Sequence, residues 1–210
     1  MKSFLTCLIF GMLAFAASCG SPQANNATSK NAPAQVKKGV QPVADAEVAV
    51  IEMENGSAYG TIKLELYSNV APKMVARFKE LAKEGYYNGI AFHRVNPSVI
   101  QAGDANTKQG ATRTAGKEGD SGKPNVEAEF SDIPYDTGVL GAARLGTDNN
   151  SANSQFFITL KREAGFDNKY TVYGKVIEGL NNVRTIAAVP KEGERPVDAV
   201  RIKSVSIVPR

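Results

Sequence analysis

Residues 91–104 read AFHRVNPSVIQAGD, two short apolar runs separated by the turn-forming residues Asn96 and Pro97. Apolar runs of this length, bounded by Asn, Gly and Asp, are typical of short β-strands rather than of helices. The stretch also holds the only histidine of the chain, His93, which stands beside Arg94. It therefore predicts short strands that carry a candidate functional pair of basic side chains.

Strand patterns of the same kind recur along the rest of the chain, with two helical patterns between them. The strand patterns cover residues 46–54, 58–66, 138–142, 155–160, 171–176 and 199–208. Asn55-Gly56 joins the first two and favours a two-residue hairpin turn. A helix begins at Pro72 and ends before Gly85, and a second helix covers about 178–187. Many short strands with two helices favour a mainly β fold, a closed barrel whose ends the helices cover.

The first 18 residues are typical of a secretory signal peptide with a lipobox. The apolar run 4–17 is too short to span a membrane. The small residues 16–18 directly precede Cys19, which resembles the bacterial signal for lipidation of that cysteine. Cys7 lies in the segment to be removed, so lipidation accounts for the single cysteine of the mature chain. The alternative is an ordinary signal peptide followed by a fortuitous cysteine.

Residues 19–45 are rich in Ser, Asn, Ala, Pro and Gln and contain no aromatic residue. This composition predicts a flexible tether, lipidated at Cys19, and a folded domain over 46–210. We expect an exported protein anchored by lipid to the cell envelope, either facing the periplasm or at the outer membrane.

The composition narrows the classes of function. The net charge is +4, but the basic residues are scattered, so nucleic acid is not an expected partner. One histidine and one mature cysteine leave too few ligands for a zinc site, and we predict no metal and no cofactor. We expect a monomer.

Three groups of residues, taken together, carry a family resemblance. The first is FHRV at 92–95, followed by Gln101, Gly103 and Asp104. The others are GVLGAAR at 138–144 with NSQFFI at 153–158, and DNKYTVYGKVIEGL at 167–180. In this order they resemble the cyclophilin family of peptidyl-prolyl isomerases, over essentially all of 46–210. The resemblance implies a closed eight-stranded antiparallel β-barrel capped by two α-helices, with isomerase activity towards X–Pro bonds in proline-containing polypeptides.

The chemistry of this reaction agrees with the residue types present. Rotation about a peptide bond has a barrier of roughly 18–20 kcal/mol because twisting destroys amide resonance. Catalysis needs a pocket that fits the twisted imide and donors that stabilise it, with no nucleophile. The twisted proline nitrogen regains its lone pair and can accept a hydrogen bond, which an always-charged guanidinium can donate.

The resemblance assigns a role to each candidate site residue. Arg94 is the expected catalytic arginine, Gln101 holds Arg94 or the substrate carbonyl, and Phe157 forms the floor of the proline pocket. The expected substrate-binding residues are Gln155 and the backbone of Ala143 and Arg144 for the residues before proline, Gly110 for the neighbouring groove, and Phe166 and Tyr170 for the far wall.

Two of these expectations have open alternatives. His93 is expected to be a hydrogen-bonded neighbour on the barrel wall, and the alternative is a direct catalytic role. Phe157 could be a plain core aromatic. However, Phe156 and Phe157 face opposite sides of a strand, so one can serve the core and the other the pocket.

The chain departs from the family pattern at two places. The segment NPSVIQ at 96–101 is one residue short and lacks an aromatic residue, so Val99 is expected to take part of its place. The chain has no tryptophan, and Gly165 falls near the position where cyclosporin-sensitive members have one. We therefore expect weak cyclosporin binding.

The sequence thus predicts a lipid-anchored peptidyl-prolyl cis-trans isomerase that acts on exported proteins. The alternative, which the shortened segment at Pro97–Ile100 leaves open, is a non-catalytic binding module or chaperone for proline-containing segments.

Overall fold

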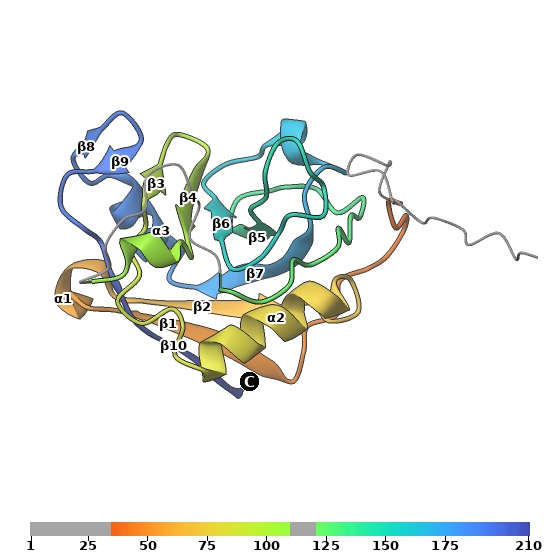
Figure 1. Ribbon diagram of the computed structural model, residues 1–210, viewed down its shortest axis with the longest axis horizontal. Coiled ribbons are helices and arrows are strands. Elements are labelled where there is room, and N and C mark those ends of the chain that lie inside the picture. Colours follow the sequence, from red (N-terminus) through yellow and green to blue (C-terminus); the bar gives the residue numbers. More distant parts are fainter. Residues whose placement is uncertain (1–34, 110–120) are drawn as a thin grey trace, which may run out of the picture.

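The computed structural model describes residues 35–109 and 121–210, which form a curled antiparallel sheet with helices packed on it (Figure 1). The eight strands lie in the order β10 (Ile202–Pro209), β1 (Glu47–Met53), β2 (Thr61–Leu66), β7 (Val172–Glu178), β5 (Val139–Ala142), β6 (Phe156–Thr159), β4 (Val99–Ala102) and β3 (Arg94–Val95). A separate two-stranded hairpin consists of β8 (Lys191–Glu192) and β9 (Arg195–Pro196).

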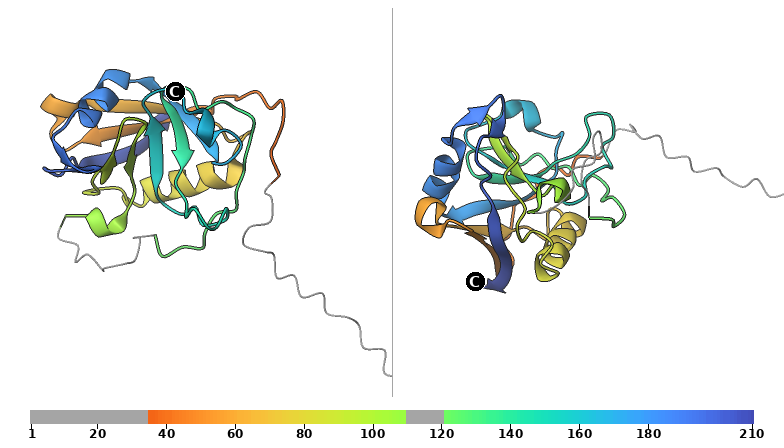
Figure 2. Two further views of the ribbon diagram at one scale, coloured as in Figure 1. Left: turned by 90° about the horizontal axis from the view of Figure 1, so that it is seen from above. Right: turned by 60° about the vertical axis from the view of Figure 1, so that its left-hand side comes forward.

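The sheet agrees with the predicted mainly β, antiparallel fold class. The fold is mainly β, with eight antiparallel strands curled into a half-barrel. Figure 2 shows the curl from two further directions. The two edge strands, β3 and β10, share no ladder, and an isolated bridge between Ala91 and Arg201 joins the segments that precede them. The continuous closed barrel expected from the sequence is therefore not shown.

Both predicted helices are present. Helix α2 (Pro72–Lys83) begins at Pro72, whose fixed φ suits the first turn, and it buries Phe78 and Leu81 in the core. Helix α3 (Leu180–Ala187) packs against β2 and β4. Two single turns of 3₁₀ helix, η1 (Ala105–Thr107) and η2 (Ala164–Phe166), occur in connections.

The predicted Asn-Gly hairpin turn is wrong. Strands β1 and β2 do pair as an antiparallel hairpin, but a one-turn helix, α1 (Gly56–Tyr59), occupies the connection. The Tyr59 N–H donates to the Asn55 carbonyl at 3.0 Å, and Gly60 at φ 62° ends the turn. Tyr59 also packs against the main core, a contact that a two-residue turn would forgo.

Residues 35–45, which the sequence assigns to the tether, lie against the domain in the structure. The Lys37 N–H donates to the Phe130 carbonyl at 2.8 Å, and Lys37 Nζ donates to the Val70 carbonyl at 2.6 Å. The Asp45 carboxylate accepts a hydrogen bond from Lys79 Nζ at 2.6 Å. The folded part of the chain therefore begins before residue 46. The predictions for residues 1–34 concern a part of the chain outside the described residues.

Candidate active site

A single cross-strand row brings the main candidate residues together. Arg94 on β3 pairs with Gln101 on β4, Gln101 with Phe157 on β6, and Phe157 with Gly141 on β5. Directly paired residues of neighbouring strands project from the same face of a sheet. Arg94, Gln101 and Phe157 therefore share one face, although 63 positions separate the first from the last in the sequence numbering.

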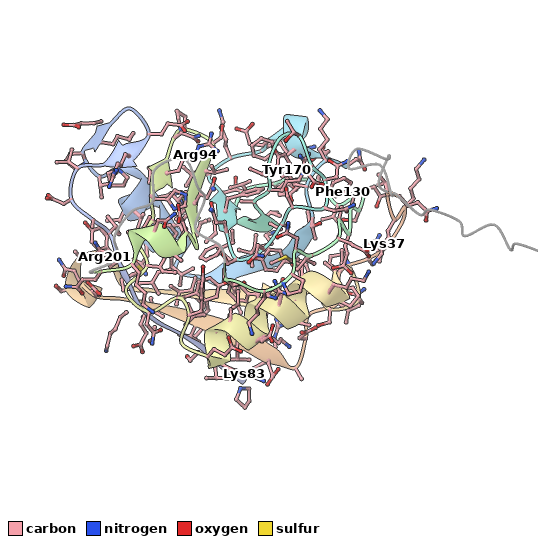
Figure 3. All side chains as sticks on the ribbon, viewed as in Figure 1. Lys37, Lys83, Arg94, Phe130, Tyr170 and Arg201 are labelled. Carbon is pink, nitrogen blue, oxygen red and sulfur yellow. The ribbon has the colours of Figure 1, made fainter. Side chains whose placement is uncertain are left out.

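Hydrogen bonds link the polar members of this site. Arg94 Nη1 donates to Gln101 Oε1 at 3.4 Å, and Gln101 Nε2 donates to Gln155 Oε1 at 2.8 Å. The Arg94 side chain remains 47% exposed. Its guanidinium is thus anchored through the two glutamines yet accessible to a bound peptide, and Figure 3 shows Arg94 beside β3 and β4.

Next to this polar chain, four aromatic rings pack together in an apolar cluster, which is the candidate pocket. Tyr135 stacks on Phe157 with ring centroids 5.6 Å apart, and Phe166 and Tyr170 meet Phe157 edge-on, each at 5.6 Å. Phe157 is 4% exposed, whereas Phe166 and Tyr170 are half-buried. Burial raises the pKa of the Tyr135 hydroxyl well above its ordinary value, so this ring is neutral and part of the apolar wall. The arrangement suits a flat, apolar ligand group.

The neighbouring phenylalanine faces the other way, as strand alternation predicts. Phe156 is fully buried in the main core and packs against Phe78 and Tyr87. Phe157 belongs to a second, smaller cluster with Tyr135 and Val99. The two adjacent rings therefore divide between the core and the candidate pocket, as the sequence indicates.

Val99 and Ala143 flank the pocket. Val99 is buried in the same cluster as Phe157. Ala143 packs against this cluster, and its N–H donates to the Gln155 carbonyl at 3.0 Å. Val99 thus belongs to the cluster around Phe157, and its role in taking part of the place of the missing aromatic residue stays a prediction.

Arg144 makes contacts that the sequence does not predict. Its guanidinium carbon lies 4.6 Å from the centre of the Tyr170 ring, and its Nε and Nη2 donate to the Lys169 carbonyl at 3.2 and 3.0 Å. Figure 3 labels Tyr170 and the nearby Phe130. Because the side chain folds onto Tyr170, it holds this wall of the pocket in place.

His93 lies apart from the pocket. Its N–H donates to the Gln101 carbonyl at 3.0 Å, which is a contact within the sheet. Its side chain lines a different hollow together with Thr107, Pro196 and Arg201, and the residues of the Arg94 row do not line that hollow. The geometry thus favours a wall position for His93 over a direct catalytic one.

Gly110 and Cys19 lie outside the described residues. Among the described residues, no cluster of three or more His, Cys, Asp or Glu side chains could hold a metal ion. Within the same residues, no helix has the length and apolar character needed to cross a membrane.

Three residues of the site were not singled out from the sequence. Tyr135 stacks on Phe157, Gly141 makes room for that ring, and Glu194 forms an ion pair with Arg94, with Nε and Oε2 2.5 Å apart. Hydrogen bonds from Arg94 and then Asn96 hold the pKa of the Glu194 carboxyl below its usual value, against a smaller effect of burial. The Glu192–Gly193–Glu194 sequence signals a turn, but no local pattern points from it to Arg94, a hundred residues away.

Comparison with known proteins identifies the family. The model of the family described as "Cyclophilin type peptidyl-prolyl cis-trans isomerase/CLD" matches residues 50–207. The chain belongs to this family. This cyclophilin is 44% identical over 131 residues to a probable peptidyl-prolyl cis-trans isomerase of Brucella suis, covering 60% of this chain and 66% of that protein. It is 37% identical to the peptidyl-prolyl cis-trans isomerase ppi1 of Schizosaccharomyces pombe, over 76% of this chain and all of the relative.

Solved structures agree with the family. A crystal structure of a cyclophilin-type peptidyl-prolyl cis-trans isomerase from Cryptosporidium parvum matches this cyclophilin with a TM-score of 0.65 and 27% identity. The match covers 77% of this chain and 96% of that one. A cyclophilin from Hirschia baltica, at 21% identity and a TM-score of 0.63 over 79% of this chain and 75% of its own, shares the fold.

Proposed function

We propose that this cyclophilin catalyses cis–trans isomerisation of X–Pro bonds at the face that carries Arg94, Gln101 and Phe157. The observation that carries the proposal is the cross-strand row itself. It places a guanidinium and a cluster of aromatic rings on one face of the sheet. A twisted prolyl imide needs both of these features together.

Each part of the face has a distinct task. The rings of Phe157, Phe166 and Tyr170 receive the proline ring, and burial of apolar surface supplies binding energy. Arg94 donates to the proline nitrogen when twisting restores its lone pair. Gln101 and Gln155 anchor Arg94, and they offer amide groups to the substrate backbone. No proton is transferred and no covalent intermediate forms.

One solved relative supports the assignment of the ligand. The Cryptosporidium parvum protein has also been crystallised in the presence of the dipeptide Ala-Pro, and that structure matches this chain at 27% identity with a TM-score of 0.64 over 78% of this chain and 98% of its own. We infer that proline-containing polypeptides are the substrates of this chain too.

The test is an isomerisation assay on the purified protein with a set of X–Pro peptides. We expect turnover that falls at least about tenfold in Arg94→Ala, with peptide affinity largely kept. The matched control is Arg184→Ala on α3, outside the row. A folded wild-type protein that binds peptides without turnover would instead favour the non-catalytic binding module.

We further propose that the chain is exported and anchored to the envelope through lipid on Cys19. The support is the apolar run at 4–17 and the small residues 16–18 before that cysteine. The clients would then be exported proteins with slow prolyl isomerisation steps. Labelling of bacterial cells with radioactive palmitate tests this: we expect label on the protein, lost in Cys19→Ser. An unlabelled wild-type protein would refute lipidation.

A further inference from the structure

Glu194 lies at the tip of the β8–β9 hairpin, which Figure 1 shows beside β3 and β4. The backbone ties this tip to the active-site strand, because the Val95 N–H donates to the Glu194 carbonyl at 2.6 Å. The hairpin therefore has a fixed place next to Arg94, independent of the Glu194 side chain.

The Glu194 carboxylate accepts two hydrogen bonds from one edge of the Arg94 guanidinium. Arg94 Nε donates to Oε2 at 2.5 Å and Nη2 donates to Oε1 at 3.4 Å, which is a two-point contact. Asn96 Nδ2 donates to the same Oε1 at 2.8 Å. Asn96 itself is fixed, because its Oδ1 accepts the N–H groups of Ser98 and Val99, each at 2.9 Å.

Gln101 holds the opposite side of the guanidinium. Its Oε1 accepts from Arg94 Nη1 at 3.4 Å, so the planar group is held between Gln101 and Glu194. A guanidinium carries five N–H donors in fixed directions. The three contacts use one on each nitrogen, which leaves one N–H on each terminal nitrogen for a substrate.

We propose that Glu194 is a positioning residue for the isomerase reaction. It fixes the Arg94 guanidinium in the orientation that donates to the twisted imide. An arginine on an exposed surface has large rotamer freedom, and ordering it only in the transition state would raise the barrier. The carboxylate orders it in advance. This inference rests on the proposed function.

The shortened segment at 96–101 takes part in the same arrangement. Asn96 begins that segment and donates a hydrogen bond to Glu194. The segment that lacks the expected aromatic residue therefore helps to hold Glu194, and through it Arg94. Asn96 thus holds the side chain of Glu194, and Glu194 in turn holds the side chain of Arg94.

The test measures kcat and KM separately for an X–Pro peptide with the full, purified protein. We expect Glu194→Gln to lower kcat about tenfold with KM nearly unchanged, and Glu194→Asp to recover a large part of the loss because it keeps the charge. The matched control is Glu192→Gln on the same hairpin, an exposed position whose change we expect to leave both constants unchanged.

A double-mutant cycle separates positioning from a general effect on the fold. In an Arg94→Ala background, Glu194→Gln should have no further effect on kcat, because the proposal places the effect of Glu194 on Arg94. A fully additive loss, or a kcat in Glu194→Gln equal to or above that of the wild type, would overturn the inference. A wild-type protein without turnover would refute the proposed function itself, which is a different outcome.

Discussion

Gly141, the fourth member of the cross-strand row, has no room for an added methyl group. A Cβ added there would lie 2.3 Å from Cζ of Phe157 and 2.8 Å from the hydroxyl oxygen of Tyr135. Ordinary van der Waals contact begins at 3.4 Å, so the Phe157 ring would have to move by about 1 Å. On its other side, the Phe157 ring contacts Phe166 and Tyr170. The ring would therefore be pushed towards these two residues, into the candidate pocket.

We expect Gly141→Ala to affect both stability and catalysis. Overpacking of this kind costs about 1–3 kcal/mol, which urea denaturation measures. A displacement of about 1 Å at a reacting site can reduce the rate by up to about 10²-fold, so we expect kcat/KM for an X–Pro peptide to fall at least about tenfold.

The matched control is Gly146→Ala, where nothing lies within 4 Å of the added Cβ. This variant should stay within about 0.5 kcal/mol of the wild type and keep its activity. If Gly141→Ala had unchanged stability and unchanged kcat/KM, the proline pocket could not be built on Phe157 in the position described.

Three further predictions concern other parts of the molecule. Burial is the largest single influence and raises the pKa of the Asp45 carboxyl, but the hydrogen bonds from Lys79 and Ser68 and the charge of Lys79 together outweigh it, so the net pKa is lowered from 3.8. The stability contributed by these contacts is therefore complete above the unfolded pKa of 3.8 and is lost as the pH falls through the folded value. Asp45→Asn should cost about 1–2 kcal/mol in urea denaturation at pH 7 and progressively less as the pH is lowered below 3.8, and a loss that does not change with pH would contradict the assignment. Arg144→Ala should raise KM for X–Pro peptides about two- to tenfold with a smaller change in kcat, because Tyr170 loses the guanidinium that stacks on it. An unchanged KM in steady-state kinetics would show that Arg144 does not support the Tyr170 wall. The wild type should bind cyclosporin weakly in calorimetry, and tight binding would refute this prediction. Gly165→Trp should tighten cyclosporin binding at least about tenfold, or about 1.4 kcal/mol. There is room for the new side chain, since nothing lies within 4 Å of a Cβ at this position.

Much of the fold follows from local patterns. Pro72 and the apolar face that includes Phe78 predict α2 because a helix places residues three and four apart on one side. The alternation of Phe156 and Phe157 predicts one ring in the core and one outside it. These features depend only on neighbours in the sequence. The connection after Asn55 shows where local signals fail, since packing of Tyr59 favours a helical turn over the expected hairpin turn.

The family could also be reached from the sequence, because its motifs are specific, and these motifs name Arg94, Gln101 and Phe157 as candidates for the site. Their alignment in one row could not, since it depends on the register of three strands, β3, β4 and β6. The same holds for Tyr135 and Gly141, whose importance is visible only beside the Phe157 ring.

Glu194 shows most clearly the difference between what the sequence predicts and what the tertiary structure decides. In the sequence it is one acidic residue in a polar turn, and nothing nearby marks it. The folded chain places it against Arg94, because the backbone of the β8–β9 hairpin is bonded to β3. The sequence by itself determines the helices, the facing of strand residues and the family. Contacts between distant residues decide the shape of the pocket and the orientation of the arginine, because these depend on how strands and loops pack in three dimensions.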